Sequence, residues 1–220
     1  MHKYMAYRVL FIDEEKDQQN DFMEYMEAAP DVEVICVYPE PDLERMIQKI
    51  DEIAPDAIVS DFLLNDIKLD ISYTVKYTGS ELVNEYQKQR PAFPCFVLTS
   101  YDDRAVTKSN DVNVVYVKDL LHNNGEAEAK AKFYEKIKEQ INKYRKAIQN
   151  AQSELNELLE KKKNAGLTLS ENERLVELDD FLEKSLDSYS ALPKDLKRSE
   201  TLDMLSKLIE NVDLLIAQNK

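Results

Sequence analysis

The stretch from residue 56 to residue 61 limits the possible folds of this chain more than any other feature. Its apolar residues Ala57, Ile58 and Val59 are mostly β-branched and lie between polar neighbours, a pattern typical of a strand buried on both faces. Asp61 follows at the point where this strand should end. In an open parallel α/β sheet, ligands bind at the carboxyl ends of the strands. The sequence therefore predicts that Asp61 lies at a ligand-binding edge.

Strand and helix patterns alternate through the first 122 residues. Apolar runs predict five strands, at residues 8–12, 32–38, 57–61, 94–98 and 112–117. Helical spacing of apolar residues predicts helices at residues 17–29, 43–53 and 80–90, with a shorter helical piece at 103–108. This alternation predicts an α/β fold with a five-stranded, doubly wound parallel sheet and helices on both faces.

The interval between Asp61 and the next plausible helix start, Gly79, is unusually long. Within it, apolar and polar residues alternate from Leu69 to Tyr77, which predicts extended chain, as an added strand or a hairpin arm. Loops of this length in compact domains are usually functional or disordered, and the alternation favours order. We expect the tyrosines of this interval to pack against the sheet rather than to bind a ligand.

From residue 126 the composition changes to many Glu, Lys, Leu and Asn, with almost no Pro or Gly. Spacing of 4-3 residues predicts one helix over residues 127–162, with a heptad seam formed by Ile137, Ile141, Tyr144, Ile148, Ala151, Leu155 and Leu158. We expect Gly166 to cap this helix, Ser170 and Glu173 to form the capping box of a second helix, and residues 202–215 to form a third. The seam can pair within this chain or between two chains.

These patterns divide the chain into three predicted parts. The first is the α/β domain at residues 1–122, with an inserted extended loop at residues 62–78. An all-α region with coiled-coil and helical-bundle character follows. It consists of a long heptad helix at residues 123–163 and a helical hairpin or bundle at residues 164–220.

Polar side chains stand at the ends of four of the predicted strands. They are Asp13 with Glu14, Asp61, Thr99 and Lys118. Because the ends of parallel strands meet at one edge, we expect these side chains to share one crevice. Carboxylates held so close repel each other, and a cation with oxygen ligands, of which Mg²⁺ is the best fit, relieves the repulsion. A lysine at the same point suits a phosphoryl oxygen.

The order and placement of these residues resemble the receiver domain of bacterial two-component response regulators, over residues 6–122. Gly79-Ser80-Glu81-Leu82 also resembles that family's Gly-x-Glu-Leu entry to its third helix. The resemblance implies that Asp61 accepts a phosphoryl group from a histidine kinase or a small phosphodonor. It implies that Thr99 and Lys118 bind the phosphoryl oxygens. The implied ligands of Mg²⁺ are Asp13, Glu14, Asp61 and the backbone carbonyl of Leu63.

The sequence departs from the family's pattern at several points. Asp119 stands where the family usually has a proline, and the loop after Asp61 carries the alternating insertion. The family's switch aromatic usually lies three residues before the lysine, where this chain has Val115, with Tyr116 one position later. These departures leave open a second interpretation, a phosphorylation-independent pseudo-receiver that serves as a scaffold.

The second half of the chain offers no enzymatic motif. We therefore expect no enzyme activity beyond self-phosphorylation and self-dephosphorylation, and we interpret this half as a protein-interaction and homodimerisation module. A nucleic-acid-binding regulator is the least favoured interpretation. The net charge is −14, and the charged side chains of the predicted helix near residues 199–218 are mostly acidic, with Lys207 the one lysine before its tail. There is no apolar run long enough to span a bilayer and no secretory signal at the start, so we expect a cytoplasmic protein without membrane contact.

Overall fold

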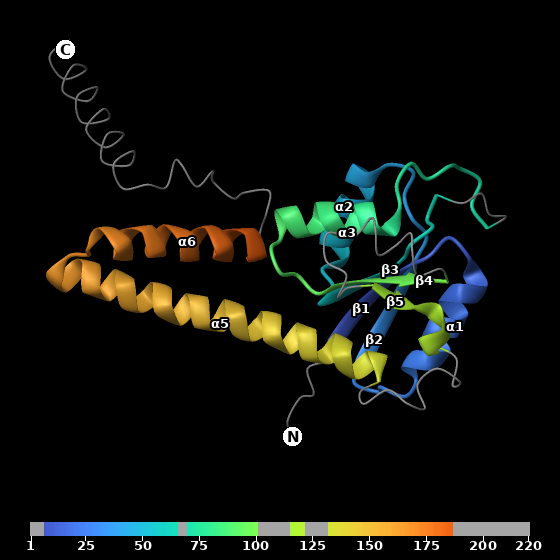
Figure 1. Ribbon diagram of the computed structural model, residues 1–220, viewed down its shortest axis with the longest axis horizontal. Helices are drawn as coiled ribbons and strands as arrows, with labels where there is room; N and C mark the ends of the chain where they lie inside the picture. Colours follow the sequence, from blue (N-terminus) through green and yellow to red (C-terminus); the bar gives the residue numbers. More distant parts are fainter. Residues whose placement is uncertain (1–6, 66–69, 101–114, 122–131, 187–220) are drawn as a thin grey trace, which may run out of the picture. The chain divides into compact units, whose positions relative to one another are not determined.

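Five parallel strands form a single sheet in the computed structural model, which describes residues 7–65, 70–100, 115–121 and 132–186. The strands are β1 (Tyr7–Ile12), β2 (Val32–Val37), β3 (Ala57–Asp61), β4 (Cys95–Thr99) and β5 (Val115–Val117). Their order is β2-β1-β3-β4-β5, and every neighbouring pair is parallel (Figure 1). This order is the flavodoxin-like one, and it confirms the predicted doubly wound, receiver-like fold.

Helices cover both faces of the sheet, and the strands are accordingly apolar on both faces. On one face, Val9 and Phe11 of β1 pack with Phe22 of α1 (Lys16–Met26) and with Phe133 and Ile137 at the start of α5 (Phe133–Ala165). The helices α2 (Leu43–Ile53) and α3 (Gly79–Gln89) cover the other face (Figure 1). Every residue of β3 is buried. The strand that ends in Asp61 is therefore held rigidly inside the domain.

The helix boundaries follow from local chemistry. Ala54 ends α2 in the left-handed conformation, with φ of 50°, immediately before Pro55. Thr78 and Glu81 form a complete capping box at the start of α3, which confirms the predicted start at Gly79. The first helix ends at Met26, earlier than the predicted residue 29, because the chain turns there: the amide of Ala29 donates to the carbonyl of Met26.

The insertion contains no strand in its described parts, residues 62–65 and 70–78, so the predicted added strand or hairpin arm is wrong for these residues. We call residues 70–79 the strap. The strap runs along the loop after β2, where the amide of Lys76 donates to the carbonyl of Pro41. A regular ladder cannot form on this loop because Pro39 and Pro41 have no amide hydrogen to donate.

The tyrosines of the strap bond the same loop through their hydroxyl groups. The Tyr73 hydroxyl donates to the carbonyl of Pro39 at 2.7 Å, and the Tyr77 hydroxyl donates to the carbonyl of Glu40 at 2.8 Å. Val75 and Tyr77 are buried, whereas Tyr73 is 39% exposed. The alternation in the sequence thus reflects alternate burial on a loop rather than pairing with the sheet.

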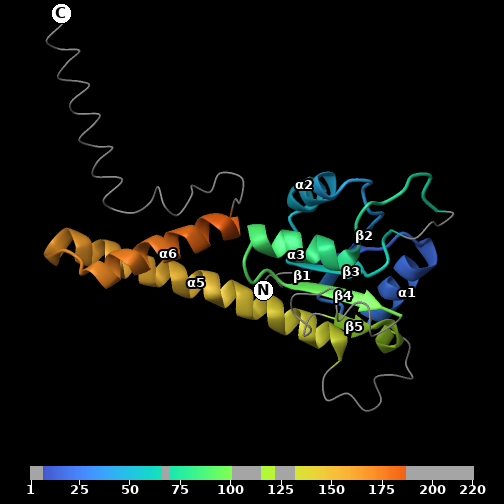
Figure 2. The ribbon, with the colours of Figure 1, turned by 45° about the horizontal axis from the view of Figure 1, so that its top comes forward.

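The chain divides into two compact units, residues 1–144 and residues 145–220. The predicted heptad seam contributes to both cores: Ile137 and Ile141 belong to the core of the sheet domain. In the second unit, Ala151 packs with Leu178 and Leu182 of α6 (Leu169–Leu186). Figure 2 shows the later part of α5 and α6 running side by side. Over the described residues, the seam is therefore used within the chain.

The turn between these two helices corrects one prediction. Gly166 has φ of +79°, as expected of a left-handed helix cap. The capping box of α6, however, is formed by Thr168 and Glu171, whose side chains accept from each other's backbone amides, and not by Ser170 and Glu173. Both pairs have the same spacing in the sequence, and the earlier one directly follows the glycine turn.

Some predictions lie outside the described residues. These are the short helix at 103–108, the first part of the strand at 112–117, the start of the long helix at 127–131 and the third C-terminal helix at 202–215. Within the described ranges, no helix combines the length and the apolar character needed to cross a membrane.

Candidate functional site

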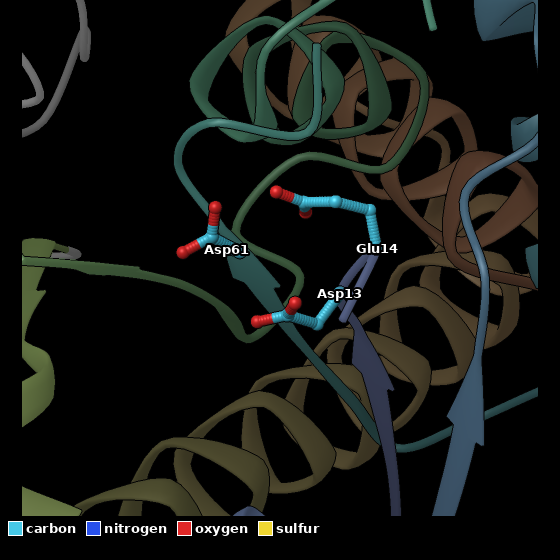
Figure 3. Close-up of side chains that lie close together, drawn as sticks. All are labelled: Asp13, Glu14 and Asp61. Carbon is cyan, nitrogen blue, oxygen red and sulfur yellow. The ribbon is translucent and has the colours of Figure 1, made fainter. Parts of the chain in front are cut away.

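Three carboxylates meet at the carboxyl edge of the sheet. Asp13 and Glu14 directly follow β1, and Asp61 is the last residue of the neighbouring strand β3 (Figure 3). One oxygen from each of the three carboxylates lies within 4.8 Å of the other two. The side chains are almost fully buried, with exposed fractions of 1% for Asp13, 2% for Glu14 and 5% for Asp61. Such crowding of buried acids requires positive charge nearby.

Lys118 provides that charge from the end of β5, the edge strand next to β4. It is the first residue of the short helix η2 (Lys118–Leu121), immediately after β5. Its Nζ atom lies 2.7 Å from Oδ1 of Asp61 and 3.1 Å from Oδ2 of Asp13. Burial acts to lower the pKa of Lys118, but Asp61 and Asp13 outweigh it and raise the pKa above its ordinary value. The lysine therefore stays charged and bridges the two aspartates.

The backbone holds Asp61 closely. The amide of Leu63 donates to Oδ2 of Asp61 at 2.6 Å, and the Ser60 hydroxyl donates to the Asp61 carbonyl oxygen at 2.9 Å. The start of α3 presses on the same peptide: a Cβ atom at Gly79 would lie 1.9 Å from the carbonyl oxygen of Asp61. Only glycine fits this position, which explains the Gly79 that the sequence places at the helix entry.

The loop that carries Asp13 and Glu14 is fixed by its own hydrogen bonds. Oδ1 of Asp13 accepts from the amide of Glu15 at 2.9 Å, and the side-chain amide of Gln19 donates to the Asp13 carbonyl at 2.9 Å. Gln19 is only 2% exposed, and its place in the site was not predicted from the sequence. The available signal was a polar residue on the inward face of α1, in line with Phe22 and Met26.

The electrostatics of the cluster favour a cation. Burial, opposed by Lys118 and assisted by Asp61, raises the pKa of Asp13 to about 6. Burial and the charges of Asp61 and Asp13 raise the pKa of Glu14 to about 8. Oε2 of Glu14 is buried without a hydrogen-bond partner. An orphaned carboxylate oxygen beside two further carboxylates is a donor set that fits Mg²⁺, which prefers hard oxygen ligands.

Thr99 and Leu63 complete the set of predicted site residues. Thr99 ends β4 and is 1% exposed, one residue beyond Leu98, which pairs with Asp61 in the sheet register. Thr99 therefore lies at the same edge as the carboxylates. At Leu63 the contact that the structure gives to the site is made by the amide. The roles of the Thr99 hydroxyl and of the Leu63 carbonyl stay predictions.

Tyr116 of β5 belongs to an aromatic cluster that was not predicted from the sequence. Its ring centroid lies 4.8 Å from that of Phe133 at the start of α5 and 5.9 Å from that of Phe96 in β4. The ammonium group of Lys136 lies 5.0 Å from the Tyr116 ring centroid. The strand that leads to Lys118 is therefore packed directly against the first turn of the long helix.

Comparisons with known proteins give matches among solved structures. No protein-family model and no curated protein matches the chain. Three structures of the response regulator RcsB are similar to it. RcsB of Salmonella typhimurium is 14% identical, with a TM-score of 0.40, over 92% of this chain and 98% of that one. An RcsB–DNA complex is 14% identical, with a TM-score of 0.41, over 90% of this chain and 98% of that one. RcsB of Salmonella enterica serovar Typhimurium, bound to a promoter in the presence of BeF₃⁻, is 13% identical, with a TM-score of 0.38, over 90% of this chain and 98% of that one. A likeness of this degree assigns no activity and no partner to this chain.

Proposed function

We propose that the sheet domain is a signalling receiver in which Asp61 accepts a phosphoryl group. The observation that carries this proposal is the convergence of three buried carboxylates and one bridging lysine at the carboxyl edge of the sheet. A purely structural ion pair would need only one acid for one lysine. The additional carboxylates, one of them with an orphaned oxygen, are costly unless a ligand uses them.

In the proposed reaction, an Asp61 oxygen attacks the phosphorus of a phosphohistidine or of a small acyl phosphate. A new O–P bond forms as the bond from phosphorus to the leaving group breaks, and the donor departs with the bonding electron pair. Lys118, already 2.7 Å from Asp61, neutralises charge on the transferred group. Asp13, Glu14 and Asp61 would hold Mg²⁺. When bound, that ion supplies further charge neutralisation for the phosphoryl oxygens.

The second unit is proposed to be the output of this switch. Its α5–α6 hairpin has its own apolar core, in which Ala151, Leu178 and Leu182 are buried. We propose that this helical module binds a protein partner or a second copy of the chain. Sedimentation of the full chain with and without acetyl phosphate tests the second copy, and the absence of any concentration-dependent association would exclude it. Duplex DNA is a suitable control ligand, since the predicted helix near residues 199–218 is acidic.

The pseudo-receiver scaffold has one observation in its favour. Lys118 bridges Asp13 and Asp61, so part of the cluster is charge-compensated without a cation. A protein of this class keeps the fold and the ion pairs but binds no metal and takes no phosphoryl group. Its prediction is therefore opposite to that of the receiver in the same experiment.

Intact mass after incubation with Mg²⁺ and acetyl phosphate separates the two proposals. We expect one added phosphoryl group in the wild-type chain, none in Asp61→Asn, and none when EDTA replaces Mg²⁺. Asp56→Asn is the matched control, because Asp56 lies just before the same strand, at the end opposite Asp61, and its carboxylate accepts from the backbone amide of Arg8. Absence of the adduct from the wild-type chain, together with no Mg²⁺ binding, would support the scaffold.

A further inference from the structure

The first turn of α1 lacks a cap from its own residues. This helix begins at Lys16, directly after the loop that carries Asp13 and Glu14. Glu15 occupies the N-cap position, but its side chain makes no capping hydrogen bond. The first amides of a helix have no partner inside the helix and must find acceptors elsewhere. An acceptor for the exposed amides of this turn therefore adds to the loop's own hydrogen bonds in holding the conformation of the acidic loop.

Asp70 of the strap supplies an acceptor from a distant part of the chain. Its Oδ2 atom accepts from the backbone amide of Lys16 at 3.0 Å, across 54 positions in the sequence. A carboxylate at a helix N-terminus is also favoured by the helix dipole. Asp70 thus does for α1 what a local N-cap residue ordinarily does.

The rest of the strap fixes the position of Asp70. Tyr73 and Tyr77 bond carbonyls of the loop after β2, and Lys76 pairs with Asp42 at 2.8 Å. The strap then ends at Gly79, whose backbone packs on the carbonyl of Asp61. One segment therefore contacts the chain that follows each of β1, β2 and β3, all at the edge that carries the acidic cluster.

We propose that Asp70 is a positioning residue for the cation site formed by Asp13, Glu14 and Asp61. By bonding the amide of Lys16, it holds the acidic loop in the conformation that points both of its carboxylates toward Asp61. It acts through the backbone and is not itself a ligand. This inference rests on the proposed function, since it concerns the affinity of the same site for a divalent cation.

Binding of Mn²⁺, measured by electron paramagnetic resonance with Mg²⁺ as competitor, tests the proposal on the full chain. We expect Asp70→Ala to weaken the affinity roughly tenfold, the lower end of the usual effect of residues that orient metal ligands. Asp70→Asn keeps a side-chain oxygen that can accept from the Lys16 amide, so we expect it to retain most of the wild-type affinity.

A matched control separates the hydrogen bond from simple loss of charge. Asp17 is an exposed acid in the first turn of the same helix, and Asp17→Ala removes one negative charge there. We expect Asp17→Ala to bind the cation almost as well as the wild-type chain. Equal weakening in Asp17→Ala and Asp70→Ala, or failure of Asp70→Asn to restore binding, would show a charge effect and overturn the proposal.

Cation binding by the wild-type chain distinguishes failure of the proposed function from failure of the proposed role of Asp70. If the wild-type chain binds neither Mn²⁺ nor Mg²⁺, the proposed function fails and Asp70 has no cation site to position. If the wild-type chain binds and Asp70→Ala binds equally well, with an unchanged circular dichroism spectrum, the function stands and the role of Asp70 is refuted.

Discussion

The ammonium group of Lys118 lies 2.7 Å from the carboxylate of Asp61, although β4 separates β3, which ends in Asp61, from β5, which ends just before Lys118. The same ammonium group reaches Asp13, just after a third strand, β1, at 3.1 Å. One side chain thus links the ends of β1, β3 and β5. Because both carboxylates are buried and the Lys118 side chain is only 13% exposed, the stability of the metal-free chain should depend strongly on this lysine.

We expect Lys118→Ala to lower the free energy of unfolding by about 3 kcal/mol in EDTA, since removing one partner leaves buried carboxylates uncompensated. Added Mg²⁺ should recover part of this loss. Lys49→Ala is the control, because the pair of Lys49 with Glu40 is about one-third exposed and should be worth less than about 1 kcal/mol. Urea unfolding measures both variants. Equal losses would contradict the assigned importance of Lys118.

Gly79→Ala should destabilise the chain and displace Asp61. The new Cβ would overlap the carbonyl oxygen of Asp61, and neither α3 nor β3 can shift without breaking buried contacts. We expect a loss of about 3 kcal/mol, at the upper end of overpacking costs. At Gly166, a Cβ meets no neighbour and only the positive φ resists substitution, so Gly166→Ala should cost about 1 kcal/mol. Thermal unfolding of both variants distinguishes steric overlap from backbone strain.

The free energy of unfolding should fall as the pH rises, mainly because of Glu14. Its pKa is about 8 in the folded chain against an ordinary value of 4.5, so the folded state binds the proton more tightly than the unfolded state. The stability linked to this proton is complete below pH 4.5 and is lost as the pH rises to about 8. Asp13, with a pKa of about 6, adds a loss of the same sign at lower pH.

Urea unfolding in EDTA from pH 5.5 to pH 8.5, a range chosen to span roughly these two pKa values, measures this dependence. We expect Glu14→Gln to flatten the profile, because the amide does not titrate. Glu33→Gln, at a more exposed glutamate paired with Arg8, should leave the slope unchanged. A wild-type profile that rises across this range would contradict the burial of Glu14 as a protonated acid.

The cap of α6 gives a test in the second unit. Thr168→Ala should cost about 1 kcal/mol of stability, because the amide of Glu171 loses its acceptor. Ser170→Ala should cost less than about 0.5 kcal/mol, the usual range for an exposed position without a capping role. Helical content and thermal unfolding of the two variants show which residue begins the helix. A larger loss of stability in Ser170→Ala than in Thr168→Ala would show that Ser170, and not Thr168, caps the helix.

Much of the sheet and of the acidic cluster could be predicted because the signals are local. Each strand is a short apolar run, and Asp13, Asp61 and Lys118 lie at or beside strand ends, so the topology alone brings them to one edge. The contact between Asp70 and Lys16 has no such signal. It joins two loops that only the folded structure brings together.

Other differences have equally specific causes. The alternation of apolar and polar residues up to Tyr77 is typical of a strand. The strap, however, runs along the loop after β2, whose prolines cannot donate the hydrogen bonds of a regular strand pair. Thr168 and Ser170 match the same capping pattern, and only the position of the glycine turn decides between them. Gln19 and the ring contacts of Tyr116 were not predicted, because a single inward polar or aromatic side chain does not show which backbone or ring it meets.

The buried, unpartnered oxygen of Glu14 has a consequence for the proposed binding of a cation. Near neutral pH this carboxyl group is mostly protonated in the metal-free chain, because its pKa is about 8. A divalent cation binds the ionised form, so binding must expel the proton. Addition of MgCl₂ to the protein in weakly buffered solution should therefore acidify it. Binding of Mg²⁺ should displace a proton from Glu14, so the apparent affinity for Mg²⁺ should rise with pH until Glu14 is ionised.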